Sequence, residues 1–241
     1  MTENAKHDNS APHARSNALS SAVHEINNPL DALFNLLLMV ESDAGLSEPS
    51  RENLRMAQAE VRRISNIAHA AMKQFHTSEA ATESDVGGLL ASVLKLHTSN
   101  LKSAGISVVK RYRYRAKLLV YPALMRQVFN NLLLNAIDAM PNGGRLHVHV
   151  AFAREWLGWK RTGLRVTIAD NGSGIARSVL HRVREPFFTT KGAAGNGMGL
   201  AVVQEIIRQH SGVFKIRSCT IPGRSGTVMA MFIPSDIGRC S

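Results

Sequence analysis

Cysteine, acidic side chains and long apolar runs are all scarce in this chain of 241 residues. The two cysteines, Cys219 and Cys240, are too few for a disulfide framework and follow no metal-binding spacing, so they fit a reducing compartment. The longest strongly apolar run, Leu36 to Val40, is far shorter than the roughly 18 residues of a membrane span. The N-terminal residues also lack the apolar core of a signal peptide. We therefore expect a soluble, cytoplasmic protein that does not itself insert into a membrane.

Basic residues outnumber acidic ones by 29 to 18, which gives a formal net charge of +11. Such an excess can attract an acidic partner, a polyphosphate or nucleic acid, or it can simply solvate the surface. The densest basic cluster alternates with Tyr112 and Tyr114, as one face of a strand would, and it comprises Lys110, Arg111, Arg113, Arg115 and Lys117. Because no nucleic-acid-binding motif accompanies this cluster, we predict a solvated basic surface and no nucleic-acid partner.

Two helical patterns occupy the first third of the chain, after polar residues 1–15, which we expect to be disordered. The first apolar stripe advances in steps of four and three through Leu19, Val23, Ile26, Leu30, Leu33, Leu37 and Val40. After an interruption with Gly45 and Pro49, a second stripe comprises Leu54, Ala57, Val61, Ile64, Ala68, Ala71 and Phe75. Residues 16–76 are thus predicted to form an antiparallel helical hairpin. Its remaining apolar residues would be covered by a second copy, giving a four-helix bundle in a homodimer, or by the downstream domain.

The pattern changes after a polar segment, residues 77–84, which we interpret as a linker. Residues 85–236 show the mixed periodicities of an α/β domain, and residues 237–241 form a tail. Helices are predicted at 85–101, 122–140 and 198–210, and strands at 106–114, 117–121, 145–153, 164–169, 213–219 and 226–233. Helices grouped with a mostly antiparallel sheet indicate a two-layer α/β sandwich. The fold class predicted for the whole chain is therefore α+β.

Two polar boxes in this domain have the chemistry of a nucleotide site. Asn131 and Asn135 project from one face of the helix that follows Pro122, and amide oxygens suit magnesium, although the pair could instead hydrogen-bond a loop. Asp170 opens the run DNGSG at the end of a strand. A carboxylate there can accept a hydrogen bond from the amine of adenine, although the run also fits an ordinary turn.

Two further boxes are rich in glycine. The run GNGMGL, residues 195–200, precedes a helix, and free amides at a helix N-terminus bind anions such as phosphate. The run GRSGT, residues 223–227, precedes the last strand and by itself fits a hairpin turn. Residues 184–191 (REPFFTTK) lie between glycine-rich segments, which predicts a mobile lid with an aromatic anchor.

The first helix carries the run HEINNPL, which begins at His24. Because His24 follows the stripe residue Val23, it should lie at the edge of the packed face and reach solvent. A neutral imidazole nitrogen is a nucleophile near pH 7, and Glu25 could accept its proton or fix its tautomer. Pro29 predicts a kink one turn later. A lone surface histidine usually has no role, but this one has six matching neighbours.

The boxes NLLLNA, DNGSG, EPFFTTK, GNGMGL and GRSGT, in this order over about residues 85–235, resemble the ATP-binding domain of histidine kinases. That fold is shared with the gyrase, Hsp90 and MutL ATPases. The resemblance implies Mg²⁺-ATP as the ligand, with Asn135 as the magnesium ligand and Asn131 beside it. At the base it implies Asp170, Gly172, Gly174 and Thr227, and at the phosphates Gly195, Gly197, Gly199 and Leu200.

This chain departs from the pattern at one position. Three residues after Asn135, where some relatives have a basic residue that touches phosphate, it has Asp138. Lys191 could supply the missing positive charge.

The HEINNPL run is similar to the H-box of two-component sensor histidine kinases, most of all the nitrogen-, oxygen- and dicarboxylate-sensing branch. This resemblance implies autophosphorylation of His24 and transfer to an aspartate of a response regulator. It also implies that Glu25 assists phosphorylation and that Asn28 orients water when the kinase dephosphorylates its regulator. No sensor segment is recognisable, so the input would come from a separate sensor protein, or the chain is a fragment. The alternatives are a non-catalytic dimeric scaffold that docks a regulator, and an ATPase or serine kinase of the same fold.

Overall fold

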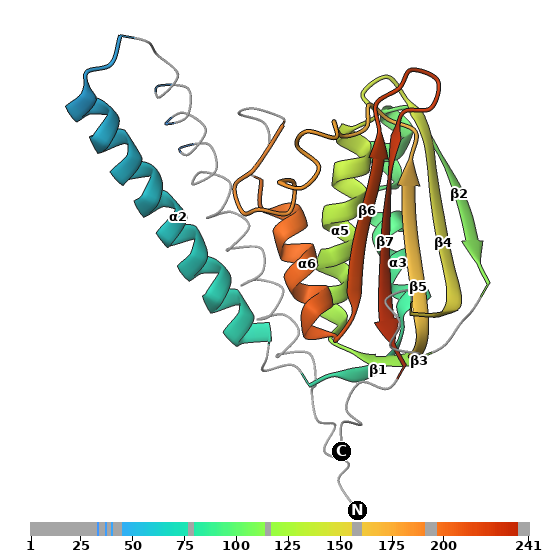
Figure 1. The fold of residues 1–241 in the computed structure, drawn as a ribbon. Helices are drawn as coiled ribbons and strands as arrows, with labels where there is room; N and C mark the ends of the chain where they lie inside the picture. The colour runs from blue at the N-terminus through green and yellow to red at the C-terminus, as the bar shows by residue number, and fades with distance from the viewer. Residues whose placement is uncertain are drawn as a thin grey trace, which may run out of the picture. The chain divides into compact units, whose positions relative to one another are not determined.

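The computed structural model describes residues 45–76, 80–113, 117–155, 161–190 and 197–235, together with Leu33, Leu37 and Val40 (Figure 1). The chain forms two compact units, one of residues 1–79 and 189–196 and the other of residues 80–188 and 197–241. Among the helices described, none is both long and apolar enough to cross a bilayer.

The N-terminal unit contributes one long helix, α2 (Glu48–His76). The helix begins within the segment that the sequence pattern assigned to a loop. Pro49 is tolerated there because the first turn of a helix does not use its backbone amides. Ser47 supports this start, since its Oγ accepts a hydrogen bond from the Ser50 amide at 3.4 Å.

One face of α2 is shielded from solvent. Leu54 and Ala57 are half-buried and Val61 is buried, whereas Ile64, the next member of the predicted stripe, is 40% exposed. Leu33, Leu37 and Val40 are helical, as predicted for the first helix. The rest of that helix lies outside the described residues, so the hairpin, the four-helix bundle and the homodimer stay predictions.

The C-terminal unit is a two-layer α/β sandwich, as the sequence predicted, built on a five-stranded sheet. The strands follow the spatial order β2 (Ile106–Tyr112), β4 (Gly144–Arg154), β5 (Thr162–Asp170), β7 (Gly226–Pro234) and β6 (Val213–Cys219). Neighbouring strands are antiparallel except β2 and β4, which are parallel. The sheet is therefore mixed, with a parallel pair at one edge.

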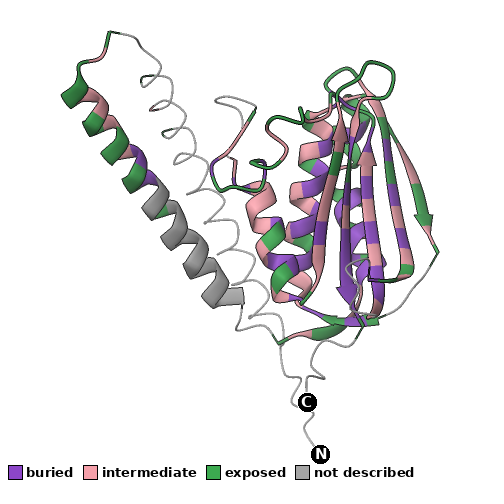
Figure 2. Ribbon diagram, viewed as in Figure 1, coloured by how far each residue is buried: buried purple, intermediate pink, exposed green. Residues whose placement is uncertain are grey.

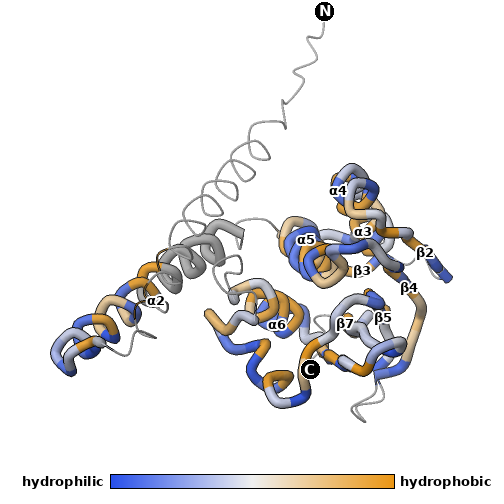
Figure 3. Tube along the Cα trace, turned by 90° about the horizontal axis from the view of Figure 1, so that it is seen from above, coloured by the Kyte–Doolittle hydropathy of each residue, from blue (hydrophilic) through white to orange (hydrophobic). Residues whose placement is uncertain are grey.

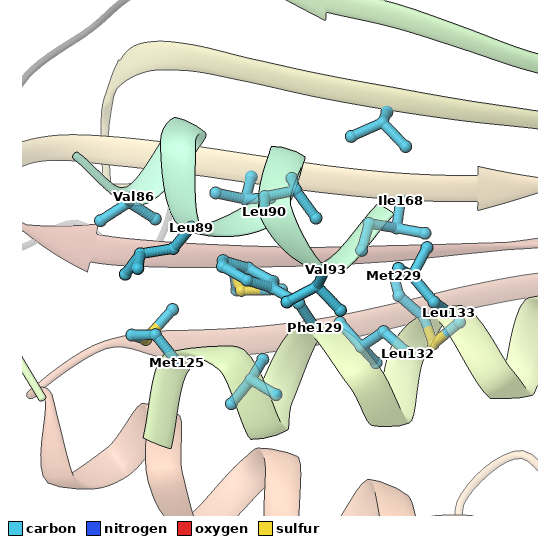
Figure 4. Packing of buried hydrophobic residues seen from close by; sticks show 14 of the residues in the cluster. Val86, Leu89, Leu90, Val93, Met125, Phe129, Leu132, Leu133, Ile168 and Met229 are labelled. Atoms are coloured by element: carbon cyan, nitrogen blue, oxygen red, sulfur yellow. The ribbon is translucent and has the colours of Figure 1, made fainter. Parts of the chain in front are cut away.

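Three helices cover one face of this sheet, namely α3 (Val86–Leu96), α5 (Pro122–Asp138) and α6 (Gly199–Gln209) (Figures 1 and 3). Buried and partly exposed residues alternate along the central strands, as expected when only one face meets the core (Figure 2). In the core, Phe129 and Leu132 of α5 lie among Leu90 of α3, Ile168 of β5 and Met229 of β7 (Figure 4). This packing fixes α5 and α6 relative to the strand ends that carry the DNGSG and GRSGT runs.

Two predicted segments differ from the structure. The expected linker, residues 77–84, overlaps Thr82–Asp85, which forms strand β1 and pairs antiparallel with β3 (Lys117–Val120). The helix predicted over 85–101 is divided at His97 into α3 and α4 (Thr98–Ser103). His97 Nε2 lies 2.7 Å from Asn130 Oδ1 on α5, a tertiary hydrogen bond that holds the junction. Such a bond is not visible in a local sequence pattern.

The sheet face opposite the helices is basic. Alternation along the strands places Arg111, Arg145, Arg165 and Arg217 on this face. His149 lies on it directly opposite Arg111, and burial, followed by Arg113, Arg165 and Arg111, lowers the pKa of this histidine. The basic cluster noted in the sequence spans two strands, as the predicted strand bounds imply, since Lys110 and Arg111 belong to β2 and Lys117 belongs to β3.

A buried histidine joins the end of α6 to the start of α5. His210 is 1% exposed, its Nδ1 donates to the Ile206 carbonyl at 2.8 Å, and its Nε2 accepts from the Tyr121 amide at 3.1 Å. The Tyr121 ring packs edge-on against the imidazole. Only the neutral ring can donate at one nitrogen and accept at the other. Burial lowers the pKa of His210, with the bond to Ile206 opposing it.

We expect His210 to make the chain less stable in mild acid. Because the pKa of His210 is lower in the folded than in the unfolded state, the unfolded chain takes up the proton first as the pH falls below about 6.5. Stability is therefore lost over that window, by at most about 1.4 kcal/mol per pH unit. His210→Gln should lower the melting temperature at pH 7.5, and the gap to the wild type should narrow by pH 5. The exposed His147→Gln is the control. A gap that stays constant with pH would rule out titration of His210 as the cause.

Candidate nucleotide-binding site

The two asparagines on α5 meet the first turn of α6. Asn131 Nδ2 donates to the Gly199 carbonyl at 3.3 Å. A Cβ placed on Gly199 would lie 3.8 Å from Asn131 Cβ and 3.8 Å from Asn135 Nδ2, which is ordinary contact distance. Both asparagines are half-buried. The helix spacing of four residues thus presents two amide groups at the N-terminus of a second helix.

Asp170 ends β5 and is held by two backbone amides. Asp170 is 8% exposed. Its Oδ1 accepts hydrogen bonds from the Gly172 amide at 3.0 Å and from the Thr227 amide at 3.2 Å. Burial raises the pKa of Asp170, while the two amide hydrogen bonds act in the opposite direction. A carboxylate kept in the interior at this cost, with one oxygen fixed, has the features of a ligand-recognition group.

The loop after Asp170 packs where side chains would not fit. A Cβ on Gly172 would lie 2.3 Å from the Ala139 carbonyl oxygen at the end of α5. Gly174 has a φ of +73°, and a Cβ there would lie 2.0 Å from the Cys219 carbonyl oxygen on β6. These contacts bring the DNGSG run against both the end of α5 and the β6–β7 hairpin.

Thr227 and Ser218 continue the polar corner across the sheet. Asp170, Thr227 and Ser218 lie directly opposite one another on the adjacent strands β5, β7 and β6. Thr227 is 4% exposed, and its Oγ1 lies 2.8 Å from Ser218 Oγ. Sequence reasoning named Asp170 and Thr227 but missed Ser218. The available signal was strand alternation, which places Ser218 on the same inward face of β6 as the buried Phe214 and the half-buried Ile216.

The segment predicted as a lid contains a buried aromatic anchor. Phe187 is 8% exposed and has a φ of +66°, a strained conformation for an aromatic residue. Arg182 lies over the Phe188 ring at 4.4 Å from its centroid. Gly197 packs on the backbone of this pair, since a Cβ there would lie 2.4 Å from the Phe187 carbonyl carbon. The GNGMGL run is therefore in contact with the segment predicted as a lid.

The predicted site residues form two groups in the described structure. Asn131, Asn135 and Gly199 meet at the start of α6, where Leu200 packs on the core. Asp170, Gly172, Gly174 and Thr227 meet at the ends of β5 and β7, and α5 joins the two groups. Of the other predicted residues, Gly197 packs against Phe187, and His24, Glu25, Asn28, Lys191 and Gly195 lie outside the described residues.

The chemistry of the two groups fits a magnesium nucleotide. Carboxamide oxygens are hard ligands that suit Mg²⁺, and a helix N-terminus offers free amides to phosphate. The described residues include no cluster of three or more His, Cys, Asp or Glu side chains that could hold a metal alone.

Residues 121–237 match the family described as histidine kinase-, DNA gyrase B- and HSP90-like ATPases. This segment includes both groups of site residues. The chain thus contains an ATPase domain of this family.

Similarity over a longer stretch narrows the class. The sensor histidine kinase ZraS of Salmonella typhimurium is 30% identical over 224 residues, which cover 89% of this chain and 44% of that protein. Sporulation kinase A of Bacillus subtilis is 29% identical over 201 residues, covering 81% of this chain and 31% of that protein. Over most of its length the chain is accordingly similar to the catalytic cores of sensor histidine kinases, and it spans less than half the length of these relatives.

Solved structures support the fold. The catalytic domain of the histidine kinase ThkA superposes with a TM-score of 0.55 at 24% identity, covering 65% of this chain and 99% of that one. The mycobacterial sensor histidine kinase MprB gives a TM-score of 0.55 at 21% identity, again covering 65% of this chain and 99% of that one. At these identities the likeness concerns the architecture.

Proposed function

We propose that this chain binds Mg²⁺-ATP, phosphorylates its own His24 and passes the phosphoryl group to an aspartate of a response regulator. The observation that carries the proposal is the Asp170 corner. A buried carboxylate has one oxygen tied to the amides of Gly172 and Thr227, and its pKa is raised by burial. Such a group lowers the stability of a core, and a buried acceptor of this kind suits recognition of the adenine amine.

The asparagines of α5 would serve the phosphate end of the nucleotide. Because the side-chain nitrogen of Asn131 donates a hydrogen bond to the Gly199 carbonyl, the Asn131 side-chain oxygen would be the atom that faces a cation. Asn135 would be the principal magnesium ligand, and the amides from Gly197 to Leu200 would receive the phosphates with Gly195. Magnesium would offset the negative charge of the phosphates. Lys191 would add a positive charge where Asp138 offers none.

The reaction itself would take place on the first helix. An imidazole nitrogen of His24 attacks the γ-phosphorus, a P–N bond forms, the bond to the β-phosphate oxygen breaks, and ADP leaves. Glu25 accepts the proton that the imidazole releases. In the second step the phosphoryl group passes from nitrogen to a carboxylate oxygen of the regulator, and the P–N bond breaks.

Several partners belong to this proposal. A second copy of the chain would complete a four-helix bundle around the predicted stripes, and a receiver domain would dock beside His24. A separate sensor protein, or further segments of a longer chain, would supply the signal. The reaction would take place in the cytoplasm, and resemblance to the nitrogen-, oxygen- and dicarboxylate-sensing branch remains a prediction.

A rival function is a non-catalytic scaffold of the same fold. The intact Asp170 corner and the contact between the asparagines and Gly199 favour the kinase, since a scaffold has no use for either. Transfer distinguishes the two. The chain, labelled from γ-labelled ATP, is mixed with receiver domains from the same genome, and one of them should gain label as the kinase loses it. A chain that never acquires label would support the scaffold.

Within the H-box we predict that neighbouring residues serve different steps. Glu25→Ala should slow autophosphorylation by roughly 10²–10⁴-fold, because a general base is lost. Asn28→Ala should spare autophosphorylation and impair dephosphorylation of the regulator, because its amide positions water. Both rates are measured with labelled kinase and labelled regulator, alongside the melting temperature. Equal loss of both activities in Asn28→Ala, with a lower melting temperature, would instead assign Asn28 a structural role beside Pro29.

A further inference from the structure

The geometry points to Ser218 as a positioning residue that sets the choice of nucleobase, through its effect on the hydroxyl of Thr227. This inference rests on the proposed binding of ATP at the Asp170 corner. It concerns a residue that the sequence motifs do not include.

Ser218 occupies the outer end of a polar row that crosses three strands. Asp170 pairs with Thr227, and Thr227 pairs with Ser218, so the three side chains point to the helix-covered face of the sheet at the same level. The next residue in the row, on β4, is Leu146, which is fully buried. A polar row that begins beside such a core residue is costly unless every group is satisfied.

The contacts of Ser218 favour one arrangement of its hydroxyl hydrogen. Its Oγ accepts from the Ile175 amide at 2.7 Å and donates to the Gly226 carbonyl at 2.8 Å. A hydroxyl has a single hydrogen, and Gly226 O can only accept it. With the Ser218 hydrogen given to Gly226 O, the remaining contact, 2.8 Å to Thr227 Oγ1, is a hydrogen bond that Thr227 donates and Ser218 accepts.

This assignment leaves Thr227 with no hydrogen for a ligand. Its Oγ1 can then act toward the pocket only as an acceptor, and ionised Asp170 is an acceptor as well. Two acceptors side by side favour the exocyclic amine of adenine, met directly or through a water. They disfavour a carbonyl oxygen at the same place, as in hypoxanthine or guanine. Ser218 thus fixes the polarity of the pocket without touching the base.

Removal of the Ser218 hydroxyl should relax this choice. In Ser218→Ala the Thr227 hydroxyl can rotate and donate to a carbonyl on the base. We compare ATP with ITP, which has a carbonyl where ATP has its amine. The ratio of the ITP to the ATP dissociation constant, measured by calorimetry with Mg²⁺ and the full chain, should fall about tenfold. The ATP constant itself should change by no more than about threefold.

Two variants show whether the effect belongs to the hydroxyl. Ser218→Thr keeps an Oγ at the same point and should retain the wild-type ratio. Thr220→Ala removes an exposed hydroxyl from the same hairpin and should change neither constant. If Ser218→Ala weakened ATP and ITP in parallel and left the ratio unchanged, its role would be structural and the inference would be overturned. If the wild type bound neither nucleotide, the proposed function would fail first.

Discussion

His24→Gln should abolish the incorporation of label from γ-labelled ATP. Under the proposed function His24 provides the only accepting nitrogen, so its loss removes the product and does not merely slow its formation. The prediction rests on the HEINNPL run and its resemblance to an H-box, because His24 lies outside the described residues. Its effect is the largest we expect, a fall to background.

Binding of ATP should survive the same change. The Asp170 corner and the asparagines of α5 belong to the other compact unit, residues 80–188 and 197–241, which has its own core. His76→Gln, a histidine change in the same N-terminal unit, serves as the control and should label normally. Undiminished labelling of His24→Gln would move the acceptor to another residue.

Asp170→Asn should weaken ATP binding without lowering the stability of the fold. The loss of affinity is the second largest effect that we expect. An amide oxygen at this position can still accept from the Gly172 and Thr227 amides, which turns the amide NH₂ toward the pocket. A donor then faces the adenine amine, and a charge-assisted hydrogen bond is lost. The dissociation constant for ATP should rise by roughly 10- to 100-fold, or about 1.5–3 kcal/mol.

Stability should move in the opposite direction. Because the pKa of Asp170 is raised in the folded state, the folded chain holds this proton more tightly than the unfolded chain. Ionisation of Asp170 therefore costs stability as the pH rises through the folded pKa, and the neutral amide avoids that cost. At pH 7 the melting temperature of Asp170→Asn should equal or exceed that of the wild type. Glu205→Gln, which removes a half-exposed carboxylate from α6, is the control. A variant that bound ATP normally would contradict the assignment of the pocket.

The sequence predicted most of the sandwich because its strands and helices carry strong local patterns. Leu146, Val148 and Val150 alternate with polar residues and became β4, and the run from Pro122 became α5. β1 was missed because TESD has no apolar alternation. This segment is a strand because it pairs with β3. The parallel pairing of β2 and β4 was missed for a similar reason, since strand partners far apart in sequence leave no local signal.

The site could be predicted only where its residues stand in a recognisable local run of sequence. Asp170 and the glycines stand in runs of unusual composition, so they are visible without a structure. Alternation along β6 places Ser218 on the inward face with Phe214 and Ile216, but only the register of β5, β7 and β6 brings it into line with Asp170 and Thr227. The role of His210 was also not visible in the sequence, because one of its two hydrogen bonds reaches Tyr121, which lies 89 positions away, and the other reaches Ile206, four positions away.

The chemistry of the label tests the assignment of a histidine kinase most directly. The wild-type chain is incubated with Mg²⁺ and γ-labelled ATP, and the labelled protein is divided between acid and alkali. A phosphoryl group on an imidazole nitrogen is lost in acid and kept in alkali, so we predict label that survives only the alkaline treatment. Label from α-labelled ATP should not be incorporated. Acid-stable label would indicate a hydroxyl acceptor, and release of free phosphate without labelled protein would indicate an ATPase, and either result would contradict autophosphorylation on His24.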